Sequence, residues 1–293
     1  MIGLAKIHSV GFALGLLVLG AGCQGIKIKK ELNVPYGEAA GQTLLLDMFQ
    51  LAAPATTPRP ALILVHGGAW SAGDKSEFSS FVPMLVKEGY VVFAVNYRLV
   101  TTDANHWPAQ LDDTQRAVRW VRAHADRYGV DSRRVGAIGG SAGGQIVACL
   151  GTSDTRDNSD ASLAVYSSRV SCVVTMSGPT DLTENMALKV KQGDWTNEQV
   201  RILLGGTPTE VPSLARSASP LLHVDARSAP TYIVQGKNDE IVPVDQAKRF
   251  DAALKKAGVD SWLLVHNGGH DLDDEAAFMK FVTDLPLFLK KNL

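Results

Sequence analysis

Hydrophobic residues along this chain are concentrated in short continuous runs. The runs "ALILVHGG", "YVVFAVNY", "RVGAIGG", "VSCVVTMSG", "PTYIVQG" and "SWLLVHNGG" are each bounded by glycine or other turn residues. Such runs are typical of strands buried on both faces of a sheet. An earlier segment, "TLLLDMFQ" at 43–50, also predicts a strand.

The segments between these runs show helical spacing. Apolar positions recur at steps of three and four from Leu111 to Ala125, which predicts a helix that runs to about Tyr128 and stops at Gly129. Further helices are expected at 78–88, from "AGGQIVACL" onward, at 244–258 and across 278–289. Alternating strands and helices predict an α/β fold, with a mostly parallel sheet and helices on both faces. In such sheets the chemistry lies at the carboxyl ends of the strands.

The first residues do not belong to this pattern. A cation at Lys6 precedes an apolar run from Ser9 to Ala21, which is too short to span a bilayer. Residues 1–22 therefore read as a signal peptide of the lipoprotein type, with Cys23 as the lipidated residue, or as ordinary secretion with Cys23 incidental. We expect an exported protein, anchored by lipid in the bacterial periplasm or outer membrane. Residues 23–42 are expected to be a polar linker before a single domain at 43–293.

Composition adds limited information. The 293 residues carry a formal net charge of −1, so there is no basic surplus, and no nucleic-acid partner is expected. Beyond Cys23 the chain has Cys149 and Cys172, which an exported protein could join in a disulfide or keep as buried thiols.

One serine lies among five glycines in "VGAIGGSAGGQIVACL". Ser141 falls between a predicted strand and a predicted helix and fits the pattern G-x-S-x-G. A sharp turn there would expose the hydroxyl above the sheet, at the positive end of the following helix. The sequence therefore predicts a nucleophilic serine.

A serine hydroxyl needs a base, and the base needs a carboxylate. In this type of fold the expected order is serine, then acid, then histidine. His270 follows the last strand and its glycine pair, so it is the expected base. His266 and His270 have the H-x-x-x-H spacing of a zinc helix, but Gly268 and Gly269 argue against a helix, so no metal is expected.

Several carboxylates compete for the role of acid. Asp239 lies in the loop after the preceding strand and is the first choice. Glu240 would point the other way in an extended loop, and Asp245 begins the next helix. Asp181, in "SGPTDL", occupies a position that some hydrolases use instead.

The glycines of "LVHGGAW" could aim backbone N–H groups at a developing oxyanion. Gly67, Gly68 and the N–H of Ala142 are the expected donors. His66 is expected to brace this loop rather than act as a base.

From Leu62 onward the chain resembles the α/β-hydrolase superfamily, in its esterase branch with an HGG-type loop. The resemblance is carried by "HGGAW", "NYRL", "WPAQLDD", "GGSAGG", "SGPTDL", "GKNDEIVP" and "GGH". The pattern is similar to exported bacterial esterases of the acetylxylan and feruloyl type, to hormone-sensitive-lipase-like carboxylesterases and to kynurenine formamidases.

The resemblance implies Ser141 as nucleophile, His270 as base and Asp239 as acid. The chain departs from the pattern at Ala69, where lipase-like relatives often have a third glycine. Trp70 is expected to form a wall for the substrate. A small lid is expected between Met186 and Pro212, where Trp195 is a further candidate substrate contact.

The sequence thus predicts a serine carboxylic ester hydrolase that forms an acyl-enzyme and needs no cofactor. The resemblance implies that its partner is a small-molecule or polysaccharide-linked ester, with short-chain, acetyl or feruloyl groups. Hydrolysis of an amide or formamide, a non-catalytic surface binding lipoprotein and a peptidase are the alternatives.

Overall fold

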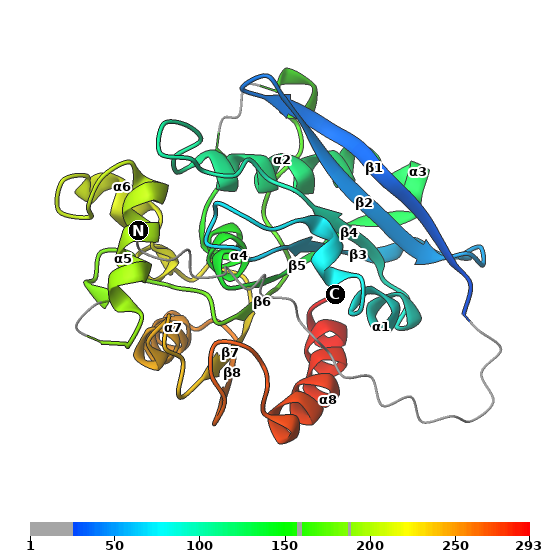
Figure 1. Cartoon of the computed structure of the whole chain (residues 1–293). Coiled ribbons are helices and arrows are strands. Elements are labelled where there is room, and N and C mark those ends of the chain that lie inside the picture. Colours follow the sequence, from blue (N-terminus) through cyan, green and yellow to red (C-terminus); the bar gives the residue numbers. More distant parts are fainter. Residues whose placement is uncertain (1–25, 157–159, 187–188) are drawn as a thin grey trace, which may run out of the picture.

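The computed structural model describes residues 26–156, 160–186 and 189–293. The predicted signal peptide and Cys23 lie outside these residues. The described chain forms one eight-stranded sheet, in the order β1-β2-β4-β3-β5-β6-β7-β8, with helices on both faces (Figure 1). The strands are β1 (Ile28–Ala39), β2 (Gln42–Leu51), β3 (Arg59–Val65), β4 (Val91–Val95), β5 (Val130–Gly140), β6 (Val173–Met176), β7 (Thr231–Gly236) and β8 (Ser261–His266).

The helices alternate with these strands, as predicted. The α-helices are α1 (Val82–Lys87), α2 (Ala109–Ala123), α3 (Ala125–Tyr128), α4 (Ala142–Thr152), α5 (Gly193–Leu204), α6 (Pro212–Ser217), α7 (Val244–Lys256) and α8 (Glu275–Asn292). Short 3₁₀ turns are η1 (Lys75–Phe78), η2 (Ala161–Leu163) and η4 (Pro220–His223). Gly129 ends α3 in the left-handed conformation, with φ of 63°, as its position in the sequence predicted.

Pairing from β4 through β3, β5, β6 and β7 to β8 is parallel, whereas β1 and β2 are antiparallel additions at one edge. The predicted α/β class with a mostly parallel sheet is therefore confirmed. The predicted linker at 23–42 is wrong, because residues 28–39 form β1, which pairs with β2 from Ile28 to Ala39 with two register shifts. Its side chains are mostly exposed or half-buried, so the polar sequence is that of an edge strand.

The side chains of each inner strand pack into two hydrophobic cores, one on each face of the sheet. On β3, Ile63 packs with α2 and α4, while Leu62 and Leu64 pack with α1 and α8 on the other face. This two-sided burial explains the continuous apolar runs in the sequence. Cys149 and Cys172 are free thiols buried in different cores, so they form no disulfide.

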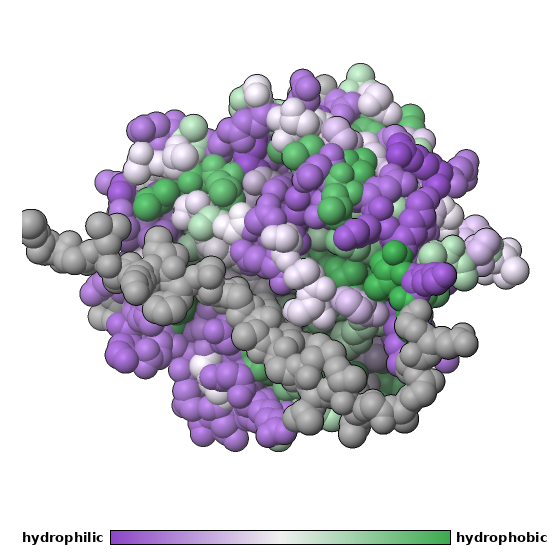
Figure 2. All heavy atoms as spheres, turned by 45° about the vertical axis from the view of Figure 1, so that its right-hand side comes forward, coloured by the Kyte–Doolittle hydropathy of each residue, from purple (hydrophilic) through white to green (hydrophobic). Residues whose placement is uncertain are grey.

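The segment expected to form a lid contains α5 and ends at the first residue of α6, and these two helices lie together at one side of the molecule (Figure 1). Val200, Leu203 and Leu204 bury one face of α5 in the core. On the face seen in Figure 2, hydrophobic residues form separate patches among hydrophilic ones. Among the described helices, none combines the length and the apolar character needed to cross a membrane.

Candidate active site

Ser141 occupies the sharp turn between β5 and α4. Its backbone has φ of 53° and ψ of −122°, a conformation that non-glycine residues rarely adopt. The turn is held from both sides, because Ser141 N–H donates to the carbonyl of Met176 at 2.7 Å and its own carbonyl accepts from the N–H of Gln145 at 3.1 Å. The predicted strand–turn–helix around the serine is therefore present.

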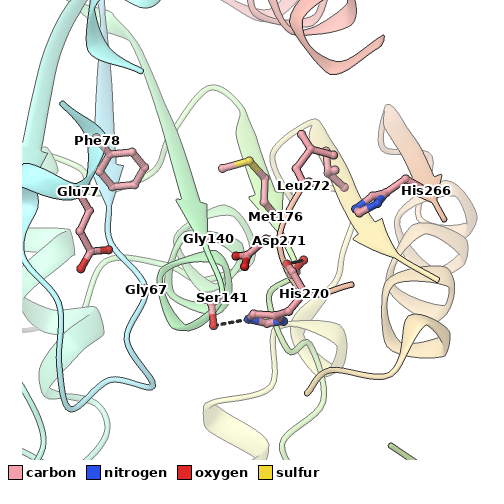
Figure 3. Close-up of a pocket in the computed structure, with 12 residues that line it drawn as sticks. Gly67, Glu77, Phe78, Gly140, Ser141, Met176, His266, His270, Asp271 and Leu272 are labelled. Atoms are coloured by element: carbon pink, nitrogen blue, oxygen red, sulfur yellow. Dashed lines mark hydrogen bonds between the residues drawn. The ribbon is translucent and has the colours of Figure 1, made fainter. Parts of the chain in front are cut away.

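His270 and Asp239 complete a continuous line of hydrogen bonds with this serine. The Nε2 atom of His270 lies 2.9 Å from Ser141 Oγ, and its Nδ1 atom lies 2.8 Å from Asp239 Oδ2 (Figure 3 shows the Ser141–His270 contact). Because an ionised carboxylate only accepts, Nδ1–H donates to Asp239 and Nε2 is left to accept the serine proton. The three side chains singled out in the sequence are thus joined through the imidazole.

Asp239 is held in a fixed orientation at the end of β7. Its Oδ1 atom accepts from the N–H groups of Ile241 and Val242 at 2.8 and 2.9 Å. Its Oδ2 atom also accepts from Gln235 Nε2 at 2.7 Å. The side chain is fully buried, so these donors replace the water that a carboxylate otherwise requires.

The rival carboxylates face other partners. Asp181 pairs with Arg249 at 3.1 Å and accepts from Thr183. Glu240, next to Asp239 in the sequence, turns outward to Lys191 at 3.1 Å. Asp245 lies in the first turn of α7, as predicted. None of these groups is placed to orient His270.

His270 is also held through its backbone. The hydroxyl of Ser177, just after β6, donates to the carbonyl of His270 at 2.7 Å. Ser177 is buried and has φ of 51°, so the end of β6 departs from regular strand geometry where it meets the histidine loop. No pattern in the sequence signalled this contact, because the residue precedes Gly178 in an ordinary-looking turn.

The glycine loop after β3 lies directly against the serine. A Cβ atom on Gly67 would be 3.3 Å from Ser141 Cβ, and Gly68 has φ of 102°, which favours glycine. Among the hydrogen bonds of the described residues, none uses the N–H of Gly67 or Gly68. Ala142 is the first residue of α4, so its N–H has no acceptor within the helix. The backbone therefore offers donors beside Ser141 Oγ.

His66 braces this loop, as expected. Its Nδ1–H donates to the carbonyl of Gly67 at 2.8 Å, and its ring stacks on Tyr97 with centroids 4.3 Å apart. The Tyr97 hydroxyl lies 3.1 Å from the His66 carbonyl and 3.2 Å from the Gly67 carbonyl. Burial lowers the pKa of His66 to about 4, so the ring is neutral near pH 7.

The two tryptophans do not occupy the expected places. Trp70 is 3% exposed and donates its Nε1–H to Gln145 Oε1 at 3.0 Å, so it is a core side chain rather than a substrate wall. Ala69 and Trp70 both have positive φ, and the sequence did not reveal this unusual turn. Trp195 is 46% exposed on α5 and does not line the pocket that contains Ser141.

The pocket at Ser141 has the glycine loop and η1 on one side, and the ends of β5 and β6 with the segment after β8 on the other (Figure 3). Its apolar lining includes Phe78, Met176 and Leu272. Its polar lining includes three side chains that no sequence motif placed here, namely Glu77, His266 and Asp271. His266 is the last residue of β8 and His270 lies in the loop after it, so the two do not share a helix, and the described residues contain no cluster of three or more potential metal ligands.

Comparison with known families agrees with this architecture. The family model BD-FAE matches residues 46–254, which is most of the chain. The chain belongs to the BD-FAE family. Two curated relatives from Mycobacterium tuberculosis are similar: esterase LipC (28% identity over 245 residues) and the probable carboxylic ester hydrolase LipM (31% over 231 residues). The matches cover 82% and 76% of this chain but only 59% and 51% of those relatives, so the chain spans about half of their length.

Solved structures confirm the α/β-hydrolase fold. An acetyl ester-xyloside bifunctional hydrolase from Caldicellulosiruptor lactoaceticus superposes with a TM-score of 0.75 and 25% identity, covering 88% of this chain and 95% of that one. Butyrate-bound esterase Est2 from Thermogutta terrifontis gives a TM-score of 0.74 and 26% identity, covering 92% and 94%. The predicted membership of the α/β-hydrolase superfamily is therefore confirmed.

Proposed function

We propose that this BD-FAE family protein is a serine hydrolase of carboxylic esters. The single observation that carries the proposal is the line of contacts from Ser141 through His270 to Asp239, with two hydrogen bonds of 2.9 and 2.8 Å. Relatives named as esterases support the same reaction class. The three side chains supply a nucleophile, a base and an orienting carboxylate.

The first half of the reaction forms an acyl-enzyme. His270 Nε2 takes the hydroxyl proton of Ser141 while Oγ attacks the ester carbonyl, and the carbonyl oxygen becomes an oxyanion. The N–H groups of Ala142 and of Gly67 or Gly68 stabilise this charge, and losing one such donor typically costs about 10²–10³ in rate. The tetrahedral intermediate collapses, and the alcohol leaves with the proton from His270.

The second half releases the acid. A water molecule gives a proton to His270 Nε2 and attacks the acyl carbon, and the returning proton restores the Ser141 hydroxyl as the carboxylic acid departs. Asp239 remains ionised and keeps the imidazole in the required tautomer throughout. Every proton in this scheme moves between Ser141, His270, substrate and water, so the reaction uses no cofactor.

For the substrate, we propose short-chain or feruloyl and acetyl esters. Support comes from the superposing acetyl ester-xyloside bifunctional hydrolase, whose name includes acetyl esters, and from the butyrate bound to Est2. The pocket beside Ser141 is also lined by only a few apolar side chains, which suits a short group better than a long chain.

The test is a substrate panel applied to the wild type and to Ser141→Ala. The panel holds p-nitrophenyl esters from acetate to decanoate, methyl ferulate, acetylated xylan and N-formylkynurenine. Hydrolysis of short or feruloyl esters by the wild type, abolished in Ser141→Ala, is the expected result. Turnover of the formamide alone would replace this proposal with amide hydrolysis, and no serine-dependent turnover from folded protein would contradict both.

We also propose that the protein is exported and carries a lipid on Cys23. The support is the sequence of the first residues, with Lys6, the apolar run from Ser9 to Ala21 and small residues before the cysteine. Expression in a bacterium with radiolabelled palmitate tests this directly. Label in the wild type and none in Cys23→Ser is the expected result, whereas equal labelling or none in either would contradict the lipid anchor.

A further inference from the structure

The glycine loop after β3 continues into a turn with an unusual backbone. Gly68, Ala69 and Trp70 have φ of 102°, 50° and 61°, so three consecutive residues lie in the left-handed region. This conformation costs free energy for residues that carry a Cβ atom, and it persists only where the surroundings hold it in place. The turn therefore depends on an anchor outside its own backbone.

The side chain of Trp70 provides such an anchor. Its indole is buried, and Nε1–H donates to Gln145 Oε1 at 3.0 Å. The carbonyl of Trp70 also accepts from the N–H of Val100 at 2.9 Å, which holds the same residue through its backbone. Trp70 lies three residues after Gly67, so a movement of the indole reaches the loop amides over a short length of chain.

Gln145 is a long polar side chain on α4, and it lies in an apolar core. It is fully buried, and its amide is paired at both ends. Oε1 accepts from Trp70, while Nε2 donates to the carbonyl of Ala218 at 2.7 Å and contacts Cys149 Sγ at 3.3 Å. A buried amide is costly unless it is paired, and a fully paired network holds one arrangement. The amide thus fixes a geometry that an apolar side chain would leave free.

Gln145 also belongs to the turn that carries the nucleophile. Its backbone N–H donates to the carbonyl of Ser141 at 3.1 Å, which closes the first turn of α4. Ala142, whose N–H is a proposed oxyanion donor, lies inside this turn. Figure 3 shows the loop at Gly67 next to the turn at Ser141. The Trp70–Gln145 hydrogen bond therefore joins the two segments from which the proposed donors come.

We propose that Trp70 and Gln145 are positioning residues for the reaction at Ser141. Their hydrogen bond sets the distance between the loop amides and the Ala142 amide, so that both reach the same developing oxyanion. Such donors act at about 2.7–3.1 Å, and a misplacement of about 1 Å can cost about 10² in rate. The inference rests on the proposed ester hydrolysis and concerns two side chains that do not touch the substrate.

A double-mutant cycle with a short p-nitrophenyl ester tests the proposal. Trp70→Phe keeps an aromatic ring but removes the N–H, and Gln145→Met keeps the length of the side chain but removes the acceptor. Each should lower kcat about tenfold with KM within about twofold, because the oxyanion forms only after the substrate has bound. The double variant should lose no more than Gln145→Met alone, since both changes break the same hydrogen bond.

A trifluoromethyl ketone reports on the oxyanion directly. When 1,1,1-trifluoro-2-hexanone binds, Ser141 Oγ adds to the carbonyl carbon, the hydroxyl proton passes to His270, and the ketone oxygen becomes an oxyanion. The inhibition constant should rise in Trp70→Phe and Gln145→Met by about the factor by which kcat falls. A purely structural role would lower the fraction of folded enzyme and leave this constant unchanged.

Trp107→Phe is the matched control. Trp107 and Trp70 are both 3% exposed, and Trp107 Nε1–H donates to Ser217 Oγ at 2.9 Å. Its partner is the last residue of α6 rather than a residue of α4. Loss of this N–H should lower the urea midpoint about as much as Trp70→Phe does. However, kcat and the inhibition constant should stay within about twofold of the wild type.

The outcomes separate this inference from the proposed function. An unchanged kcat in folded Trp70→Phe and Gln145→Met overturns the inference, and so does an equal loss in Trp107→Phe. Losses that multiply to about a hundredfold in the double variant also overturn it, because the two residues then act independently. If Trp70→Phe does not fold, Gln145→Met and the trifluoromethyl ketone decide. If the wild type hydrolyses no ester in a Ser141-dependent manner, the proposed function fails and the inference fails with it.

Discussion

Gly143, in the first turn of α4, faces the end of β3 so closely that a Cβ atom at this position would lie 2.1 Å from the carbonyl oxygen of Val65. The carbonyl oxygen of His66 would be 2.4 Å away. The glycine therefore lets the N-terminus of α4 approach the loop that carries Gly67. This contact brings the backbone donors of two distant segments to one serine.

Gly143→Ala should consequently destabilise the protein. The methyl group meets backbone rather than a flexible side chain, so α4 or the end of β3 must move, at about 2–3 kcal/mol of the free energy of unfolding. Urea unfolding of the wild type and the variant measures this difference. Gly269→Ala is the control, because a Cβ atom there meets nothing within 4 Å, and it should change stability by less than about 0.5 kcal/mol. Equal stability of the two variants would contradict the close approach.

Asp239→Asn should reduce kcat by about 10³–10⁴-fold. The amide side chain can donate to His270 Nδ1, which would place the proton on Nε2 and leave that atom unable to accept from Ser141. Steady-state hydrolysis of a short p-nitrophenyl ester measures the loss. Glu240→Gln changes the neighbouring charge, which pairs with Lys191 at the surface, and should keep kcat within about twofold. A comparable loss in both variants would show that charge alone, rather than the tautomer, is responsible.

Tyr97→Phe should lower kcat by about tenfold with little change in KM. The hydroxyl contacts the carbonyl groups of both His66 and Gly67, and its removal frees the loop whose amides we propose as oxyanion donors. The phenyl ring keeps the stacking on His66. Tyr232→Phe removes a hydroxyl that contacts Asp284, outside the pocket, and should leave kcat unchanged. An equal kcat in Tyr97→Phe and the wild type would exclude a positioning role for this hydroxyl.

The inner part of the fold was predictable because strands buried on both faces leave continuous apolar runs in the sequence. β1 lacks this two-sided burial and was therefore missed. It is a half-exposed edge strand, and its charged residues, such as Lys29, Lys30 and Glu31, resemble those of a linker. Its pairing with β2 depends on tertiary contacts that no local pattern encodes. The strands that are buried on both faces were therefore predictable, whereas the edge strand was not.

The meeting of Ser141, Asp239 and His270 could be predicted from their order along the chain. Each residue follows a parallel strand, and the loops after parallel strands lie at the same edge of the sheet. Asp239 could be separated from Asp181 by its loop, and the structure places Asp239, rather than Asp181, at His270. Trp70 was misjudged because the positive φ of Ala69 and Trp70 turns the ring inward. The position of Glu77 in the pocket lining was not predicted, because a glutamate in the first turn of a helix is already explained by its capping role.

The buried His66 should make stability depend on pH. Its folded pKa of about 4 lies below the ordinary value of 6.5, so between these values the unfolded chain binds a proton that the folded chain does not. The free energy of unfolding should therefore fall as the pH is lowered through this window, by about 2 kcal/mol between about pH 7 and about pH 5 from this residue. Above about pH 7.5, where the unfolded histidine is also neutral, the contribution is constant.

Urea unfolding of the wild type and of His66→Phe at several pH values isolates this effect. The phenyl ring can keep the stacking on Tyr97 but cannot titrate, so the variant should lose less stability on acidification than the wild type does. His266, whose pKa burial also lowers, adds a fall of the same sign to both proteins and cancels in the difference. Identical slopes in the two proteins would mean that His66 takes up its proton without unfolding, and hence that the glycine loop tolerates a charged ring.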